Sequence, residues 1–218
     1  MTTAGVESLY PFLYSAPDEP DALLAEVARS TAEKAREIVD LRQALAVEYG
    51  DRLVECARRL AAAFAAGGTL YAFGNGGSST DAEDLSHLLL HPPPGNHPLP
   101  AISLTQDVAV LTALSNDVGY DVVFARQLAA FARAGDIAVG LSTSGGSTNV
   151  LRAFEEASRR GVLTVGLAGG GGGRMAESDA VDFLFAVPSA SVHRVQEGQT
   201  TLYHVLWELT QWALDDRL

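Results

Sequence analysis

Apolar residues recur at helical spacing along the first third of the chain and then gather into short continuous runs. A helical pattern opens at Asp18 and Pro20, which mark a helix entrance, and it continues to Tyr49 and Gly50. A second pattern of the same period covers residues 51–67. The spacing therefore predicts two amphipathic helices before the first strand. The first is long and can contain a kink.

Short apolar runs then alternate with helical segments. Nearly continuous apolar strands between helices are typical of a parallel sheet that is covered on both faces. The pattern therefore predicts an α/β protein, a three-layer α/β/α sandwich with a five-stranded parallel sheet, preceded by N-terminal helices and closed by a helix over about residues 195–214. The predicted strands cover residues 69–73, 101–104, 137–141, 163–167 and 182–187.

Length and composition restrict the class of protein. The chain has 218 residues, of which 47% are hydrophobic and 19% charged, so it can bury the core of one domain with a helical appendage. Intrinsic disorder is excluded as a general description. The formal net charge of −12 repels phosphate backbones and anionic headgroups, which argues against a nucleic acid or a membrane surface as partner. A small anion can still be held by local backbone dipoles.

The single cysteine, Cys56, indicates the compartment. One cysteine cannot form an internal disulfide, which fits a reducing cytoplasm. Cys56 lies at helical spacing from Leu53, Leu60 and Phe64, so it is expected to be a buried apolar side chain and not a nucleophile. The first residues lack the basic flank and apolar core of a signal peptide, and no run approaches the length of a membrane span. These features predict a cytoplasmic protein.

Glycine and hydroxyl residues gather where two of the predicted strands end, in residues 74–81 and 141–149. Glycine lets the backbone approach a ligand, hydroxyls donate hydrogen bonds, and the following helix presents free N–H groups, so such a loop can hold a phosphate without lysine. An ordinary turn with a Ser or Thr cap is the alternative for either loop alone. The second loop carries more hydroxyl residues than one cap needs: Ser142, Thr143, Ser144 and Ser147.

A third glycine run covers residues 169–173 and also follows a predicted strand. A flexible connection and a loop that closes over a ligand are both open interpretations. Neither this run nor the glycines at 74–77 has the spacing of the dinucleotide fingerprint. No nucleotide cofactor is therefore expected.

Several segments, in this order, are similar to those of a known family. They are GNGGSSTDA (74–82), LPAISLTQDVAVLTALSND (99–117), FARQ (124–127), RAGDIAVGLSTSGGSTNVLRAFEEA (133–157), GGRMAE (172–177), VPS (187–189) and RVQE (194–197). The chain thereby resembles the sugar isomerase (SIS) domain family and, within it, the phosphoheptose isomerases, which act on sedoheptulose 7-phosphate. The resemblance implies an SIS domain over residues 51–218 and a helical oligomerisation segment of a homotetramer over residues 1–50.

The resemblance also implies a ligand, a small phosphorylated sugar, and the residues around it. Gln196 and His204 would reach the active site from one face of the last helix, with His204 as an acid/base catalyst. In metal-bound members of the family the same two side chains bind zinc. Without the resemblance, His204 would be interpreted as a core histidine whose ring nitrogens have hydrogen-bond partners within the protein. The residues implied around the phosphate are Ser78, Ser142, Thr143, Ser144 and Ser147, and those near the sugar are Asn75 and Asp107.

One helix departs from the family pattern. After GNGGS the family carries D-A-x-H-x-x-x-E, with the histidine as metal ligand and the glutamate as general base. This chain has Asp84 and Leu88 at those two positions. Because leucine cannot abstract a proton, the departure puts catalysis in question.

The replacement still carries chemically useful groups. Asp84, His87 and His91 share one face of a helix, and two histidines four residues apart have a familiar metal-ligand spacing. Together with Gln196 and His204, a rearranged site could use His204, Asp84 and His87 for acid/base catalysis. Asp84, His87, Gln196 and His204 could instead hold zinc. The alternative is a solvated Asp84 and a helix that ends at His91 before a proline.

Two functions from different classes follow. An aldose–ketose isomerase of a phosphorylated sugar would shuttle a proton with His204 and use Asp84 or His87 in place of the glutamate. A non-catalytic, sugar-phosphate-binding or regulatory partner-binding homotetramer would keep the phosphate loops and need no base, which Leu88 favours.

Overall fold

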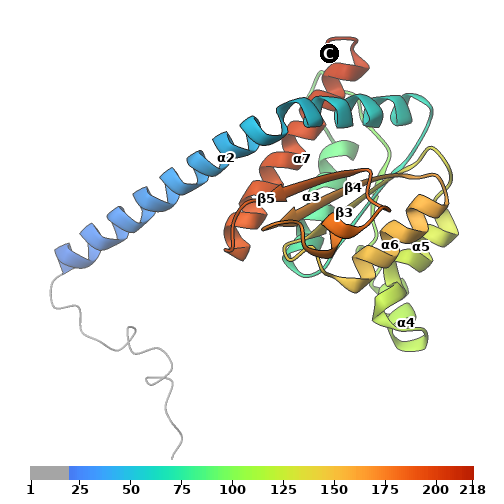
Figure 1. The fold of residues 1–218 in the computed structure, drawn as a ribbon, viewed down its shortest axis with the longest axis horizontal. Helices are drawn as coiled ribbons and strands as arrows, with labels where there is room; N and C mark the ends of the chain where they lie inside the picture. The colour runs from blue at the N-terminus through green and yellow to red at the C-terminus, as the bar shows by residue number, and fades with distance from the viewer. Residues whose placement is uncertain (1–19) are drawn as a thin grey trace, which may run out of the picture. The chain divides into compact units, whose positions relative to one another are not determined.

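The structure is a computed structural model that describes residues 20–218, with side chains described from Leu23 onward (Figure 1). Residues 41–218 form one compact unit, and the described residues before them belong to a separate one. The predicted helix entrance at Asp18 lies outside the described residues. No helix in the described part of the chain combines the length and the apolar character needed to cross a bilayer.

A single helix replaces the two that the sequence pattern predicts. α2 (Pro20–Ala65) continues through Gly50 without a break. Glycine lowers helix stability by about 1 kcal/mol relative to alanine, but it keeps its backbone N–H and so does not interrupt the hydrogen-bond ladder as proline would. The predicted boundary after residue 50 is therefore wrong, whereas the predicted end just before Gly67 is confirmed.

Five parallel strands form one sheet in the order β2-β1-β3-β4-β5. The strands are β1 (Leu70–Gly74), β2 (Ala101–Ser103), β3 (Ile137–Ser142), β4 (Leu163–Gly169) and β5 (Phe183–Val187). Every residue of β1, β3 and β4 is buried, as expected for central strands covered on both faces. The five predicted strands and their parallel direction are confirmed.

Helices cover both faces of the sheet, which confirms the predicted three-layer α/β/α sandwich (Figure 1). One apolar layer joins the sheet to α2, α3 and α7, and the other joins it to α5 and α6. Successive residues of β1 serve opposite layers, since Leu70 belongs to the first and Tyr71 to the second. The helices after α2 are α3 (Gly77–Leu90), α4 (Val108–Asp117), η2 (Tyr120–Val122), α5 (Val123–Phe131), α6 (Thr148–Arg159), η3 (Gly173–Glu177) and α7 (Val192–Leu214).

Cys56 lies on α2 inside the first apolar layer and is fully buried. Burial raises the pKa of its thiol to about 12. A neutral and inaccessible thiol is a poor nucleophile. The expectation that Cys56 is a core residue is confirmed.

The order of the strands changes the direction of the connections between β1 and β3. From β1 the chain crosses to β2 on one side, while β3 lies on the other side of β1. In open parallel sheets of this order, ligands bind at the carboxyl ends of the two strands where the connections diverge. Gly74 at the end of β1 pairs with Leu141 of β3, so the loops after these strands start side by side.

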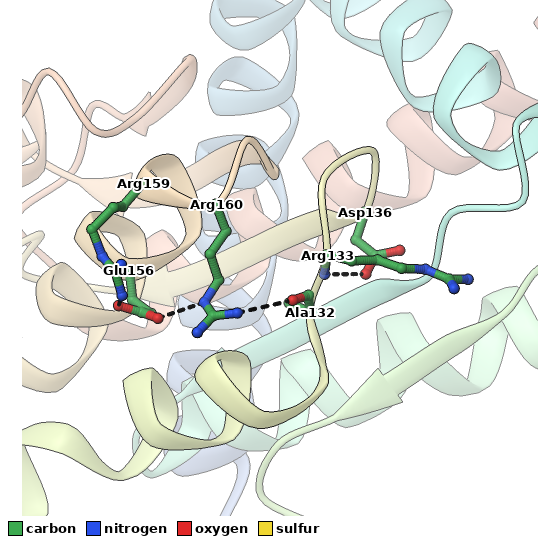
Figure 2. Close-up of polar contacts among 6 residues, drawn as sticks. All are labelled: Ala132, Arg133, Asp136, Glu156, Arg159 and Arg160. Atoms are coloured by element: carbon green, nitrogen blue, oxygen red, sulfur yellow. Dashed lines mark hydrogen bonds and ion pairs between the residues drawn. The ribbon is translucent and has the colours of Figure 1, made fainter.

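A buried carboxylate fixes the amino ends of the strands, at the opposite edge of the sheet (Figure 2). Asp136 directly precedes β3 and is only 1% exposed. Its side chain accepts hydrogen bonds from the backbone N–H groups of Thr69 and Arg133, each at 2.9 Å. Asp136 therefore ties the turn before β3 to the residue before β1.

An ion-pair network lies close to this turn (Figure 2). Glu156 on α6 pairs with Arg159 and Arg160. The hydrogen bond from Arg159 is the largest of the effects that lower the pKa of Glu156. Arg160 also donates to the carbonyl oxygen of Ala132 at 3.4 Å, so the network links α6 to the end of α5.

We expect Asp136→Ala to lower the free energy of unfolding by about 2–4 kcal/mol, because it leaves two backbone N–H groups without their partner. Urea unfolding measures the loss. Glu155→Ala, at an exposed position of α6, is the matched control and should change stability by less than about 0.5 kcal/mol. Equal stability of the two variants would contradict the assigned role of Asp136.

Candidate functional site

The loop after β3 gathers three serine hydroxyls at one point. Ser142 ends β3, and Ser147 directly precedes α6. The Oγ atoms of these two residues lie 2.9 Å apart, and the Oγ of Ser144 lies 3.4 Å from that of Ser142. The side chain of Ser147 makes no capping hydrogen bond to its own helix. This arrangement favours a loop that binds an anion over an ordinary serine cap.

The loop after β1 closes tightly against the last helix. Ser78 lies in the first turn of α3 and is 4% exposed. At Gly77 the side-chain amide of Gln196 approaches so closely that a Cβ atom would collide with it. Gln196 on α7 therefore reaches this loop, and a larger residue at position 77 would displace its side-chain amide.

The glycine run after β4 packs onto the serine loop. The backbone N–H of Met175 donates to the carbonyl oxygen of Gly145 at 2.9 Å. Gly145 has a φ of +63°, and a Cβ there would collide with the carbonyl oxygen of Gly172. Gly169 similarly lies against the carbonyl of Thr143, which is itself half-buried. The glycine run therefore supports the serine loop. This role differs from both interpretations left open by the sequence, a flexible connection and a loop that closes over a ligand.

Three polar side chains from separate segments meet beside these loops. Asn75 and Asn149 exchange two hydrogen bonds, Nδ2 of each donating to Oδ1 of the other at 2.8 and 2.9 Å. Tyr120 of η2 donates its phenolic O–H to Oδ1 of Asn75 at 2.8 Å. The sequence placed Asn75 near the sugar. It did not identify Tyr120 and Asn149, because they lie 45 and 74 residues from Asn75 along the chain.

Asp107 has a local partner in the structure. It precedes α4, and its carboxylate accepts a hydrogen bond from the backbone N–H of Val110 at 3.0 Å. Asp107 follows β2, so it lies at the carboxyl edge of the sheet like the two loops. One carboxylate oxygen thus caps the helix.

A polar contact between α3 and α7 joins Asp84 to the neighbourhood of His204. Tyr203 donates its O–H to Oδ2 of Asp84 at 2.7 Å, and its ring stacks on that of His204 with centroids 4.8 Å apart. Burial raises the pKa of Tyr203, and the hydrogen bond to Asp84 adds to the rise.

The tautomer of His204 follows from one contact. Its Nδ1 lies 2.9 Å from the backbone carbonyl oxygen of Thr200. A carbonyl can only accept, so Nδ1 carries a proton and the Nε2 of the neutral ring is left unprotonated. A half-buried imidazole with a free Nε2 can accept a proton from a ligand.

His87 faces His91 instead of α7. The two rings lie 4.8 Å apart at the exposed end of α3, where Leu88 between them in sequence is half-buried. Across residues 23–218 no three His, Cys, Asp or Glu side chains come together as metal ligands. Tyr203 therefore contacts both Asp84 and His204, whereas His87 packs against His91.

Asp81 is a further carboxylate of α3 that sequence analysis did not single out. Its Oδ2 is buried and has no hydrogen-bond partner among the described residues. Burial and the nearby charge of Asp84 raise the pKa of Asp81 to about 6. The spacing of Asp81 and Asp84, one helical turn apart, was the available signal.

Sequence and structure both match known proteins over most of the chain. A family model described as the SIS domain matches residues 35–169. The phosphoheptose isomerase of Desulfovibrio desulfuricans is 44% identical over 181 residues, which cover 83% of this chain and 85% of that protein. That of Aquifex aeolicus is 38% identical over 183 residues, covering 84% and 95% respectively. A solved phosphoheptose isomerase from Neisseria gonorrhoeae has a TM-score of 0.76 at 33% identity and covers 84% of this chain and 97% of its own.

Replacing Asp81 should stabilise the protein in a pH-dependent way. Because the folded-state pKa of Asp81 is raised to about 6, the native state binds more protons than the unfolded state between its ordinary pKa of 3.8 and that value. Ionising Asp81 therefore reduces stability as the pH rises through 6. We expect Asp81→Asn to be more favourable, relative to wild type, at pH 8 than at about pH 5.3.

Urea unfolding at the two pH values measures this difference, and the lower value stays above the pI of 4.7. Glu83→Gln, at an exposed neighbouring position, is the control. An Asp81→Asn effect that is the same at both pH values would show that Asp81 ionises normally.

Proposed function

Because the chain belongs to the SIS domain family and, within it, to the phosphoheptose isomerases, we propose that it isomerises a phosphorylated sugar between aldose and ketose forms. The observation that carries the proposal is the cluster of serine hydroxyls at the carboxyl end of β3, beside the loop that follows β1. Sedoheptulose 7-phosphate, the substrate that the resemblance implies, is the first candidate.

The phosphate would be bound by hydroxyl and backbone groups. Ser142, Ser144 and Ser147 converge at the start of α6, whose first N–H groups lie at the positive end of the helix dipole. Ser78 and Thr143 complete the proposed set. This mode of binding suits a chain with a net charge of −12, because it needs no lysine or arginine.

The reaction moves a proton between adjacent carbon atoms through an enediol. It needs a base for one carbon and a donor for the neighbouring oxygen. His204 is proposed as the proton carrier. Its Nδ1–H donates to the backbone carbonyl oxygen of Thr200, which leaves Nε2 free to accept a proton from the sugar. Gln196, which contacts Gly77 in the first loop, is proposed to orient the sugar.

The carboxylates of α3 are proposed to replace the missing glutamate. Leu88 cannot act as a base, but Asp84 lies one turn earlier and contacts Tyr203 beside His204. Asp81 has a pKa of about 6, which suits proton exchange near neutral pH. His87 remains a predicted alternative, although its ring packs against His91.

Zinc remains a prediction. Asp84, His87, Gln196 and His204 are the ligands that the sequence offers. Asp84 already accepts a hydrogen bond from Tyr203, and no group of three His, Cys, Asp or Glu ligands forms within the described part of the chain. Zinc binding by this set, which includes the amide of Gln196, therefore stays a prediction, and no step of the proposed reaction is assigned to a metal ion.

A regulatory role is the second candidate function. Leu88 stands where the family has its general base, while the serine loop is intact. A protein of this kind would bind the phosphorylated sugar without turning it over. We also propose the cytoplasm as its location, because the single cysteine is buried and cannot form an internal disulfide.

Purified protein should convert sedoheptulose 7-phosphate into an isomeric aldose phosphate, detectable by ion-exchange chromatography of the products with and without added zinc. Ser144→Ala should weaken binding of the sugar phosphate about 10- to 100-fold, since it removes a hydrogen bond to a charged group. A thermal-shift titration measures that affinity.

Leu88→Glu separates the two candidate functions, with Leu88→Gln as a control of similar size that lacks a base. Binding without turnover in wild type, together with turnover in Leu88→Glu alone, would support the regulatory role. If no phosphorylated sugar stabilises the wild-type protein, both candidate functions are wrong.

We further propose that the chain assembles as a homotetramer through its N-terminal helix. Leu24 and Val27 are 65% and 54% exposed on α2, and exposed apolar side chains on one helix favour association. Light scattering after gel filtration should give the mass of four chains for wild type. The double variant Leu24→Glu and Val27→Glu should give a smaller mass, whereas Glu33→Gln on the same helix should not. A monomeric wild type would contradict the proposal.

A further inference from the structure

The three side chains that meet beside the phosphate loops form a closed hydrogen-bond unit. Asn75 and Asn149 are joined by two hydrogen bonds, and Tyr120 adds a third to the oxygen of Asn75. Each residue comes from a different segment: the loop after β1, the first turn of α6 and η2. We call Asn75, Tyr120 and Asn149 the amide triad.

The amide triad fixes which way the Asn75 side chain points. A carbonyl oxygen has two lone pairs, and those of Asn75 are taken by Tyr120 and Asn149. Its nitrogen has two N–H groups, of which one donates to Asn149. Asn75 therefore has no accepting capacity left and one N–H still to donate.

Exposure decides which member of the triad a ligand can reach. Asn149 is only 3% exposed, whereas Asn75 is half-buried and Tyr120 is 49% exposed. Asn149 lies two residues after Ser147, and Asn75 directly follows Gly74 at the end of β1. The hydrogen bonds between Asn75 and Asn149 thus join the loop after β1 to the first turn of α6, the helix that follows the hydroxyls proposed to bind phosphate.

We propose that Tyr120 and Asn149 are positioning residues that hold Asn75 as an obligate hydrogen-bond donor to an oxygen of the sugar. This inference rests on the proposed function, because it assigns a subsite next to the proposed phosphate loop. Without the phenol, one lone pair of Asn75 is free to accept a hydrogen bond and only the two bonds to Asn149 hold its amide, so the donor is held less firmly.

A purely structural role for Tyr120 is the competing explanation. α4, which leads to η2, has no buried residue, so the phenol could simply anchor η2 to the sheet. An anchor would affect stability and the whole site alike. A positioning residue affects sugar recognition and leaves recognition of phosphate alone unchanged.

The test is Tyr120→Phe, which removes only the phenolic oxygen of a partly exposed side chain. Thermal-shift titrations with sedoheptulose 7-phosphate and with inorganic phosphate give the two affinities. We expect affinity for the sugar phosphate to fall about tenfold, as for the loss of one hydrogen bond, with affinity for inorganic phosphate unchanged. Tyr71→Phe is the matched control, since that phenol donates to the backbone of Phe131 and not to Asn75.

Two results for Tyr120→Phe would overturn the inference: wild-type affinity for the sugar phosphate, or an equal loss of affinity for both ligands. The second would identify Tyr120 as an anchor. Failure of the proposed function gives a different result from failure of this inference. Sedoheptulose 7-phosphate would then not stabilise the wild-type protein, and the proposed sugar subsite would also be wrong.

Discussion

The parallel pairing of β1 with β3 is the constraint on which the candidate site depends. Their register sets Gly74 beside Leu141, so two loops that are distant in sequence begin at neighbouring points of one sheet edge. The connections diverge there, which leaves the space between the loops free of a crossing helix. Every other contact of the site, including the amide pair of Asn75 and Asn149, requires this register.

The proposed function has an acidic protein bind an anion through hydroxyls and helix dipoles. In the serine loop the side chain of Ser147 makes no capping bond to α6, and its Oγ lies 2.9 Å from that of Ser142. Omitting a cap lowers helix stability by about 1 kcal/mol. The glycine run packs against Gly145 and donates a hydrogen bond to its carbonyl oxygen, which supports the loop in the conformation that brings its hydroxyls together.

The sheet could be predicted from the sequence because buried parallel strands leave a local signature. Strand β3, for example, is a continuous apolar run, and its end is marked by the hydroxyl residues that follow. The helical region was less predictable. Gly50 is a residue type that often marks the end of a helix, but here its backbone is helical and α2 continues through it.

Contacts between segments were the least predictable part of the site. Tyr120 has no local feature that identifies it, and its partner Asn75 is 45 residues away. The resemblance indicated Gln196 and His204, but the tautomer of His204 depends on the carbonyl of Thr200, which only the folded helix presents. Residue type and spacing thus locate the site, while tertiary geometry decides what each group donates or accepts.

The position of the carboxylates on α3 bears on whether the site still performs chemistry. A carboxylate in the first turns of a helix is favoured by the helix dipole, which lowers its pKa. Asp81 shows the opposite shift, which comes from its burial and from the charge of Asp84. Carboxyl groups with a raised pKa are found more often at proton-transfer sites than elsewhere in proteins. The proposed reaction therefore assigns the role of the base to the carboxylates of Asp81 and Asp84 and not to Leu88.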